Sequence, residues 1–242
     1  MKQIFILGAV LSSFFANAQD TFNLSEKNNI VKANVSALAF RNFQFGYERI
    51  INKQFSIGAN LGLFAKGGIP YIGAFGVDEK LKEVSVGGTT FTLEPRYYVG
   101  KKGYGQGFYL APYYRYAHYK VSDFNLTVDV NQYDIPITLS GTASSHNIGL
   151  MIGAQWFLGS QKNWVLDAWF IGAHYGKASG DIHGKTSRLL TAQEQKEVKK
   201  ELDDLDIPVV KYETSVHANG ADMKLDGPWA GVRSGISIGY RF

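Results

Sequence analysis

The stretch GISIGYRF, residues 235–242, alternates small or polar residues with large apolar ones. A period of two residues is typical of a β-strand that has one apolar and one polar face. The polar face carries Gly235, Ser237, Gly239 and Arg241, and the apolar face carries Ile236, Ile238, Tyr240 and Phe242. A strand of this kind needs an apolar environment on one side only, so the next question is whether the pattern recurs.

The same alternation recurs along most of the chain. It is found in Val31–Ala39, Phe43–Tyr47, Phe55–Leu63, Phe91–Tyr97, Phe108–Tyr116, Ile148–Trp156, Leu166–Phe170 and Ala230–Phe242. These runs predict eight strands, each with about the nine to eleven residues that cross a membrane when tilted. Eight is the smallest strand number of outer-membrane β-barrels. We therefore predict an all-β fold, an eight-stranded, antiparallel, up-and-down transmembrane β-barrel.

Short and long connections between the runs alternate along the chain. Residues 52–53, 100–107 and 159–163 make short connections. Apart from a tight turn at 41–42, the others are long: Phe64–Gly88, Val121–Ala143 and Gly176–Pro228. Short periplasmic turns and long external loops are typical of membrane barrels, so we expect both termini to be periplasmic.

The last long loop contains one predicted helix, TAQEQKEVKKELDDLDIP. Thr191 is a candidate N-cap, and Glu194 three residues later completes a capping-box pattern. Val198, Leu202 and Leu205 form a weak apolar stripe, and Pro208 is expected to end the helix. Two interpretations remain open: a solvated helix that lies over the loop, or a lid or partner-binding helix.

The composition excludes several classes of function. The 242 residues include no cysteine, which excludes disulfides, a thiol nucleophile and cysteine-ligated metal. The net charge of +4 is carried by scattered residues, so we expect no binding of nucleic acid. Residues 1–18 resemble a secretory signal peptide that ends in Ala16-Asn17-Ala18. We divide the rest into a periplasmic tail, 19–29, and one outer-membrane barrel domain, 30–242.

The polar face of nearly every run contains glycine and charged residues. This pattern favours a narrow polar lumen, with the apolar faces of the strands in contact with lipid. Pro95 and Pro112 interrupt two runs roughly opposite each other, and we expect one shared bulge there. The expected lumen charge network comprises Glu48, Glu94, Arg96, Arg115, Asp167, Arg233 and Arg241. Because unpaired buried charges are costly, we expect this network to plug the lumen, with a narrow pore or an acid–base pair as alternatives.

One weak catalytic candidate lies near the expected outer rim. Ser144 and His146 share one face of a strand, as in a serine–histidine dyad, but no carboxylate is placed beside them by the sequence. The histidines match no metal motif, and no phosphate loop or dinucleotide motif is present. We therefore predict no cofactor, no metal and no enzyme activity, with an outer-rim lipid-modifying enzyme as the alternative.

Several segments resemble the small outer-membrane β-barrel proteins of Bacteroidota, which form a family of unknown function. The most specific are Tyr47-Glu48-Arg49, Glu94–Tyr98 and the strand around Asp167. The resemblance runs from about Ile30 to Phe242 and implies an eight-stranded barrel in the outer membrane, without an established activity.

Taken together, the sequence predicts a structural or surface-binding protein of the cell outer membrane. Its expected partners are outer-membrane lipid and lipopolysaccharide, the barrel-assembly machinery and an external ligand of the loops. The alternating run with Ile238, Tyr240 and Phe242 also resembles a barrel-assembly signal.

Overall fold

The computed structural model describes residues 27–68, 84–130, 133–204 and 211–242. The expected signal peptide, 1–18, and most of the expected tail, 19–29, lie outside the described residues. In chain order the elements are β1 (Asn29–Asn34), η1 (Ser36–Phe40), β2 (Asn42–Ile50), β3 (Phe55–Gly68), β4 (Ser85–Gly103), β5 (Gln106–Val130), β6 (Tyr133–Leu158), β7 (Trp164–Thr186), α2 (Ala192–Asp203), β8 (Tyr212–His217) and β9 (Gly220–Arg241). No helix among these residues is long and apolar enough to cross a membrane.

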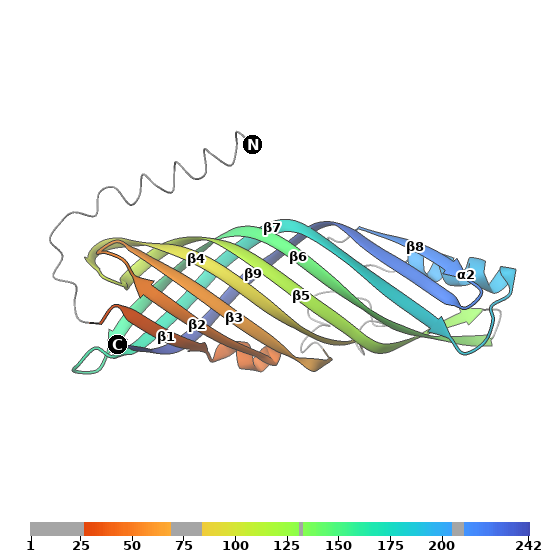
Figure 1. Ribbon diagram of the computed structural model, residues 1–242, viewed down its shortest axis with the longest axis horizontal. Coiled ribbons are helices and arrows are strands. Elements are labelled where there is room, and N and C mark those ends of the chain that lie inside the picture. The colour runs from red at the N-terminus through yellow and green to blue at the C-terminus, as the bar shows by residue number, and fades with distance from the viewer. Residues whose placement is uncertain (1–26, 69–83, 131–132, 205–210) are drawn as a thin grey trace, which may run out of the picture.

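Eight of the strands form a closed ring (Figure 1). The order is β1-β2-β3-β4-β5-β6-β7-β9, every neighbouring pair is antiparallel, and β1 pairs with β9 to close the ring. The closing pair matches Ile30 with Arg241 and Asn34 with Ser237. The predicted all-β, antiparallel arrangement of eight sequentially ordered strands is thereby confirmed. The ninth strand, β8, lies outside the ring and pairs with β9 over residues 220–225.

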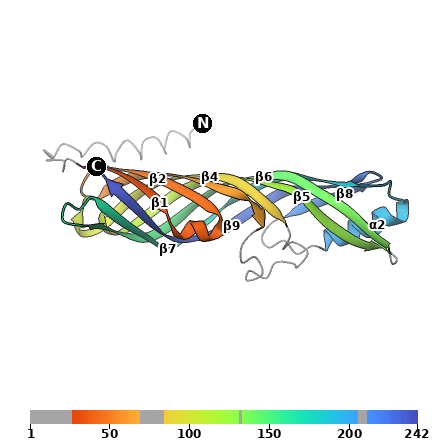
Figure 2. The ribbon, with the colours of Figure 1, turned by 90° about the horizontal axis from the view of Figure 1, so that it is seen from below.

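The strands differ greatly in length, which the sequence interpretation did not anticipate. β1 and β2 have 6 and 9 residues, whereas β5 and β6 have 25 and 26. Nearly all of the predicted loop Val121–Ala143 and about half of the predicted loop Gly176–Pro228 is therefore strand, so the prediction of long irregular loops there needs correction. We call the part formed by residues 121–143, 176–204 and 211–228, where described, the extension. Figures 1 and 2 show it at the end of the molecule opposite the C-terminus.

A hydrophobic core explains why the extension is regular structure. Its inward side chains are apolar, and α2 covers them with Val198 and Leu202, both buried. The core cluster comprises Val84, Phe124, Ile135, Ile137, Leu139, Leu190, Val198, Leu202, Ala221, Met223 and Leu225. The helix thus packs against this core through Val198 and Leu202, and its outer face is charged.

The predicted start of the helix is confirmed. Thr191 is the N-cap, its Oγ1 accepts from the Glu194 backbone N–H at 3.3 Å, and Glu194 Oε2 accepts from the Thr191 N–H at 2.8 Å. The helix ends at Asp203. Leu205 and Pro208, the expected last apolar position and the expected stop, lie outside the described residues.

Two local predictions need correction. The first run does not continue as a strand to Ala39, because Asn34 Oδ1 accepts from the Ala37 N–H at 2.9 Å and starts the turn of η1. Pro95 and Pro112 do lie opposite each other, but without the expected bulge. The pairs Leu93–Tyr114 and Tyr97–Leu110 flank the prolines in one continuous register, so the missing N–H groups interrupt the ladder without shifting it.

Candidate functional site: a buried ion network and an external cleft

Five charged side chains from four strands meet inside the ring. Lys32 comes from β1, Glu48 from β2, Glu94 and Arg96 from β4, and Asp167 from β7. All five stand on the inward faces of their strands, and they meet because the ring is closed and narrow. Lys32 Nζ lies 2.6 Å from Glu48 Oε2 and 2.7 Å from Asp167 Oδ2. Arg96 Nη1 lies 3.2 Å and 2.8 Å from the same two oxygens, and Arg96 also pairs with Glu94.

Neutral side chains complete the network around these charges. Glu48 Oε1 accepts from Ser56 Oγ at 2.5 Å and from Tyr98 OH at 2.7 Å. Asp167 Oδ1 accepts from Tyr109 OH at 2.8 Å. Gln155 Oε1 accepts from Lys32 Nζ at 3.0 Å. Both oxygens of Glu48 and of Asp167 are therefore hydrogen-bonded, which offsets the cost of burying the charges.

Side chains pack the interior of the ring at the level of the network and between the network and the end of the ring that holds the C-terminus. Glu48, Glu94 and Asp167 are fully buried, and Arg96 is 1 % exposed. An apolar cluster lies next to the network, two residues farther along each strand toward the end that holds the C-terminus. It consists of Ile30, Ile50 and Val165, with Phe157 packed against them. Tyr98, Tyr109, Tyr113, Met151 and Trp169 form a second buried cluster beside the network. Side chains thus fill the interior at this level, and a solvent-exposed acid–base pair is absent from the network.

The sequence prediction of the network is partly right. Glu48, Glu94, Arg96 and Asp167 are brought together as expected. Lys32, Gln155 and Tyr98 were missed as members, although each has the inward parity of its strand, and that parity is the signal that could have identified them.

Three predicted members lie away from the centre of the network. Arg233 Nη1 is 3.7 Å from Glu94 Oε2, and Arg115 Nη1 donates to Thr92 Oγ1 at 3.1 Å. Arg241 lies at the other end, with its guanidinium 4.6 Å from the centre of the Phe157 ring. The arginines are therefore spread over three levels of the interior rather than gathered in one cluster.

The outer face of the ring differs sharply from its interior. The side chains of Ile236, Ile238, Tyr240 and Phe242 are all exposed, as are those of Phe43, Phe45, Leu61, Leu93 and Leu110 on other strands. Aromatic side chains pair near the end with the C-terminus, where Trp164 and Tyr240 lie 5.8 Å apart. The ring therefore exposes an apolar belt, which is made of the alternate apolar residues that the sequence predicts on the outer face.

Ser144 and His146 do not form the predicted dyad. The hydrogen bond of Ser144 Oγ joins it to His118 Nδ1 at 2.9 Å, and His146 Nδ1 bonds to Tyr114 OH at 2.6 Å. The antiparallel register causes this, since it places Ser144 opposite His118 and His146 two pairs farther along, opposite Tyr116. Two residues apart on a strand, the two side chains share a face but are directed to different partners.

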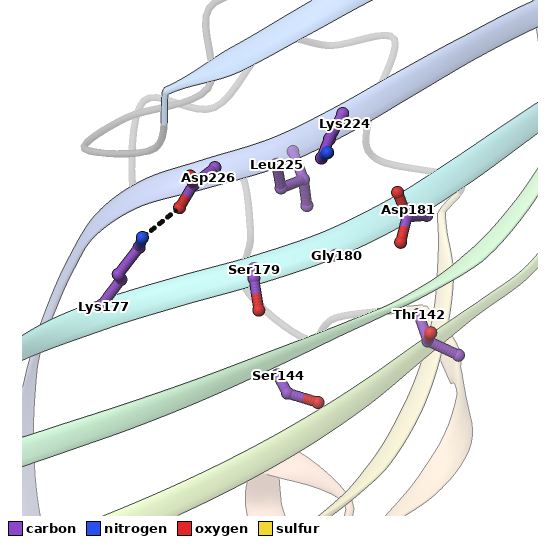
Figure 3. A pocket seen from close by; sticks show the side chains of 9 residues that line it. All are labelled: Thr142, Ser144, Lys177, Ser179, Gly180, Asp181, Lys224, Leu225 and Asp226. Carbon is purple, nitrogen blue, oxygen red and sulfur yellow. Dashed lines mark ion pairs between the residues drawn. The ribbon is translucent and has the colours of Figure 1, made fainter.

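Ser144 instead lines a cleft of about 380 Å³ on the outer face of the extension (Figure 3). Ser179 and Asp181 of β7 and Lys224 and Asp226 of β9 line it as well. Lys177 Nζ pairs with Asp226 Oδ1 at 2.7 Å, and both side chains are more than half exposed. The cleft offers hydroxyl groups and charges of both signs, and its lining contains no nucleophile paired with a base that a carboxylate orients.

The remaining chemistry of the extension is electrostatic. Hydrogen bonds from Arg188 and from the Thr191 backbone lower the pKa of Glu194 to about 2. His183 Nδ1 lies 2.6 Å from Asp222 Oδ1, and His217 Nδ1 lies 3.8 Å from Asp222 Oδ2. Over the described ranges, no group of three or more histidine and acidic residues has the geometry to hold a metal ion.

No protein family model matches the chain, and no curated protein matches it. The site must therefore be interpreted from its own geometry.

Proposed function

We propose that this chain is an integral β-barrel protein of the cell outer membrane, with a plugged interior and a folded extracellular projection. In this proposal the ring spans the bilayer and the extension stands outside it. The projection provides a structural or ligand-binding surface, and no reaction is assigned to it. Both termini then lie on the periplasmic side.

One observation carries the proposal: the chemistry of the outer face changes along a single strand. On β6, Ile148, Leu150 and Ile152 point outward and are 73 %, 49 % and 47 % exposed. Farther along the same face stand Ser140, Thr142 and Ser144. A water-soluble ring would expose polar side chains at both levels, so the apolar level is best explained by contact with lipid.

The apolar belt also ends abruptly on the neighbouring strand, β5. On β5 the large apolar outward residues run from Phe108 to Tyr114, and His118 and Lys120 follow on the same parity. Tyr114, Tyr116 and His146 lie close together at the change, with the Tyr116 and His146 rings 5.0 Å apart. Amphipathic aromatic rings at such a boundary are typical of membrane interfaces, and they support placing the surface of the bilayer here.

The alternatives receive less support. A pore needs a water-filled path, whereas Glu48, Glu94 and Asp167 are fully buried within the ring. A lipid-modifying enzyme built on Ser144 and His146 needs them to be hydrogen-bonded, and each bonds elsewhere. The closed interior and the folded extension favour a barrel that acts through its external surface.

Single cysteines test the proposal cleanly because the chain contains none. Cysteine would replace Ile148, Leu150 or Ile152 in the belt, and Ser140 or Thr142 in the extension. The protein is inserted into lipid vesicles and treated with a water-soluble maleimide. The extension cysteines should be labelled rapidly and the belt cysteines protected. Rapid labelling at both levels in folded protein would refute the proposed membrane span.

The location is tested separately in cells. Outer-membrane fractions should contain the full-length protein in a form that changes electrophoretic mobility on boiling. Recovery in the soluble periplasmic fraction would contradict the assignment to the outer membrane.

A further inference from the structure

Two arginines occupy the side of the ion network nearer the extension. Arg115 comes from β5 and Arg233 from β9, and both point into the ring. The side chain of Arg233 is 7 % exposed and Arg115 is 8 % exposed. Both side chains are thus nine-tenths buried, and the Nη1 and Nη2 atoms of Arg233 are themselves buried.

The guanidinium of Arg233 is held in place, but two of its three nitrogens, Nη1 and Nη2, lack a hydrogen-bond acceptor among the described residues. It lies over the Trp169 ring at 4.6 Å and the Tyr113 ring at 4.9 Å, so aromatic faces fix its plane. Its Nη1 and Nη2 donate to no acceptor among the described residues. The closest carboxylate oxygen, Glu94 Oε2, is 3.7 Å from Nη1, which is beyond hydrogen-bond distance.

Positive charge also exceeds negative charge at this level. In the centre of the network, Lys32 and Arg96 face three carboxylates. Here Arg115 and Arg233 are close enough for their charges to repel each other, and Glu94 Oε2 is the acidic oxygen near them. Buried polar groups in native proteins nearly always have a partner, and buried charges are costly without one. These donors therefore require an acceptor that the described side chains do not supply.

The inward face of β4 adds further polar atoms beside the two arginines and toward the extension. Arg115 Nη1 donates a hydrogen bond to the hydroxyl of Thr92. Thr90 Oγ1, two residues farther along β4, is buried and has no hydrogen-bond partner among the described residues. A threonine hydroxyl can donate as well as accept. The interior on this side of the network thus contains two guanidinium groups and, two residues farther along β4 than Thr92, a hydroxyl without a partner among the described residues.

We propose that Arg233 and Arg115 bind a small oxyanion, with the Thr90 hydroxyl as an additional donor. The planar fork of a guanidinium matches two oxygens of a phosphate or carboxylate group. A bound oxyanion balances the charge at this level and satisfies the free donors. This inference goes beyond the proposed function, which assigns no ligand to the interior of the ring.

Titration with inorganic phosphate tests the site. The full-length protein in detergent micelles is titrated by calorimetry at constant ionic strength, with sodium chloride as the competing salt. We expect saturable binding at one site per chain and a rise in unfolding temperature with phosphate concentration. Absence of saturable phosphate binding, or equal stabilisation by chloride at the same ionic strength, would overturn the proposal and leave only water or a non-specific ion at the arginines.

Variants connect the binding to the two arginines. R233Q and R115Q should each weaken phosphate binding by about tenfold or more, since each removes a charge-assisted contact. R241Q is the matched control, because Arg241 also lies inside the ring over an aromatic ring but at the other end. Equal affinities for R233Q and the unchanged protein, or an equal loss in R241Q, would contradict the proposed site.

The design separates folding from binding. Should R233Q fail to fold, R233K keeps the charge but loses the fork and should still weaken binding, and T90V tests the hydroxyl alone. Unchanged affinity in the folded members of this set would overturn the proposal. Membrane placement is measured independently by cysteine labelling, so a missing anion site and a wrong membrane span give different results.

Discussion

The ring and the extension share the strands β5, β6, β7 and β9, but their apolar side chains face opposite ways. In the ring portion of β6, Ile148 and Leu150 face outward and Gln155 faces inward. In the extension, Ile135, Ile137 and Leu139 of the same strand face inward and are buried. The parity that points inward is unchanged, and only the chemistry of the two faces is exchanged.

The difference teaches that alternation and environment are separate properties of a strand. Alternation follows from the pleat, which sends successive side chains to opposite faces. Which face is apolar depends on the medium outside. An apolar core inside a polar surface suits water, whereas an apolar outer face with a polar interior suits lipid. The level on β6 at which the two patterns meet, between His146 and Ile148, therefore marks the proposed surface of the bilayer.

The polar interior of the ring should give the largest effect. D167A removes a carboxylate that binds Lys32 and Arg96. Leaving those buried cations with fewer partners should lower the free energy of unfolding by about 3–5 kcal/mol. Urea unfolding from lipid vesicles, followed by tryptophan fluorescence, measures this change.

D226A is the matched control for D167A. Asp226 makes an equally short ion pair, to Lys177, but both side chains are largely exposed. We expect less than about 1 kcal/mol for this exposed pair. Similar losses for the two variants would mean that the interior of the ring is as well solvated as its surface.

The apolar interior of the extension should give the next largest effect. I137A removes most of a fully buried side chain from the core under α2. Such a truncation costs about 2–5 kcal/mol, and it should expose the amide protons of α2 to hydrogen exchange. I148A, on the outer face of the same strand, should leave the exchange of α2 unchanged. Faster exchange of α2 in both variants would contradict two separate packing regions.

The outer faces distinguish the regions by a third test. L150R places a cation in the proposed lipid belt and should destabilise the inserted protein by about 2–4 kcal/mol. S140R places the same side chain on the outer face of the extension, where water can solvate it, and should have a small effect. Unfolding from vesicles measures both, and equal stabilities would refute the assignment of lipid to one level and water to the other.

The smallest effect concerns the pH dependence of α2. The folded-state pKa of Glu194, about 2, lies below its usual value of 4.5. A lowered pKa means that the contribution is fully present above pH 4.5 and is lost as the pH falls toward 2. Hydrogen exchange of α2 should therefore accelerate over that interval and stay constant above it. E194Q should remove this dependence, and an unchanged pH profile in E194Q would assign it to another group.

The candidate site was only partly predictable. The parity of each run correctly placed Glu48, Glu94, Arg96 and Asp167 inside the ring. It also contained Lys32, Gln155 and Tyr98, but nothing in the sequence states which inward residues lie at the same height. Height depends on the stagger between neighbouring strands, and the register that pairs Ser144 with His118 is a consequence of the same stagger. For that reason the predicted Ser144–His146 pair was wrong, although the shared face was right.

Local chemistry that can be recognised in the sequence controls several elements of this fold. The period of two fixed which side chains face inward, the short connections fixed the antiparallel order, and Thr191 with Glu194 fixed the start of α2. The boundary between the polar interior of the ring and the apolar core of the extension, in contrast, depends on how the strands assemble. The reason is that the predicted loops carry their own alternation, and its apolar side chains are recognisable as a core only when β5, β6, β7, β9 and α2 bring them together. The free donors of Arg233 are likewise visible only after the ring has closed around them.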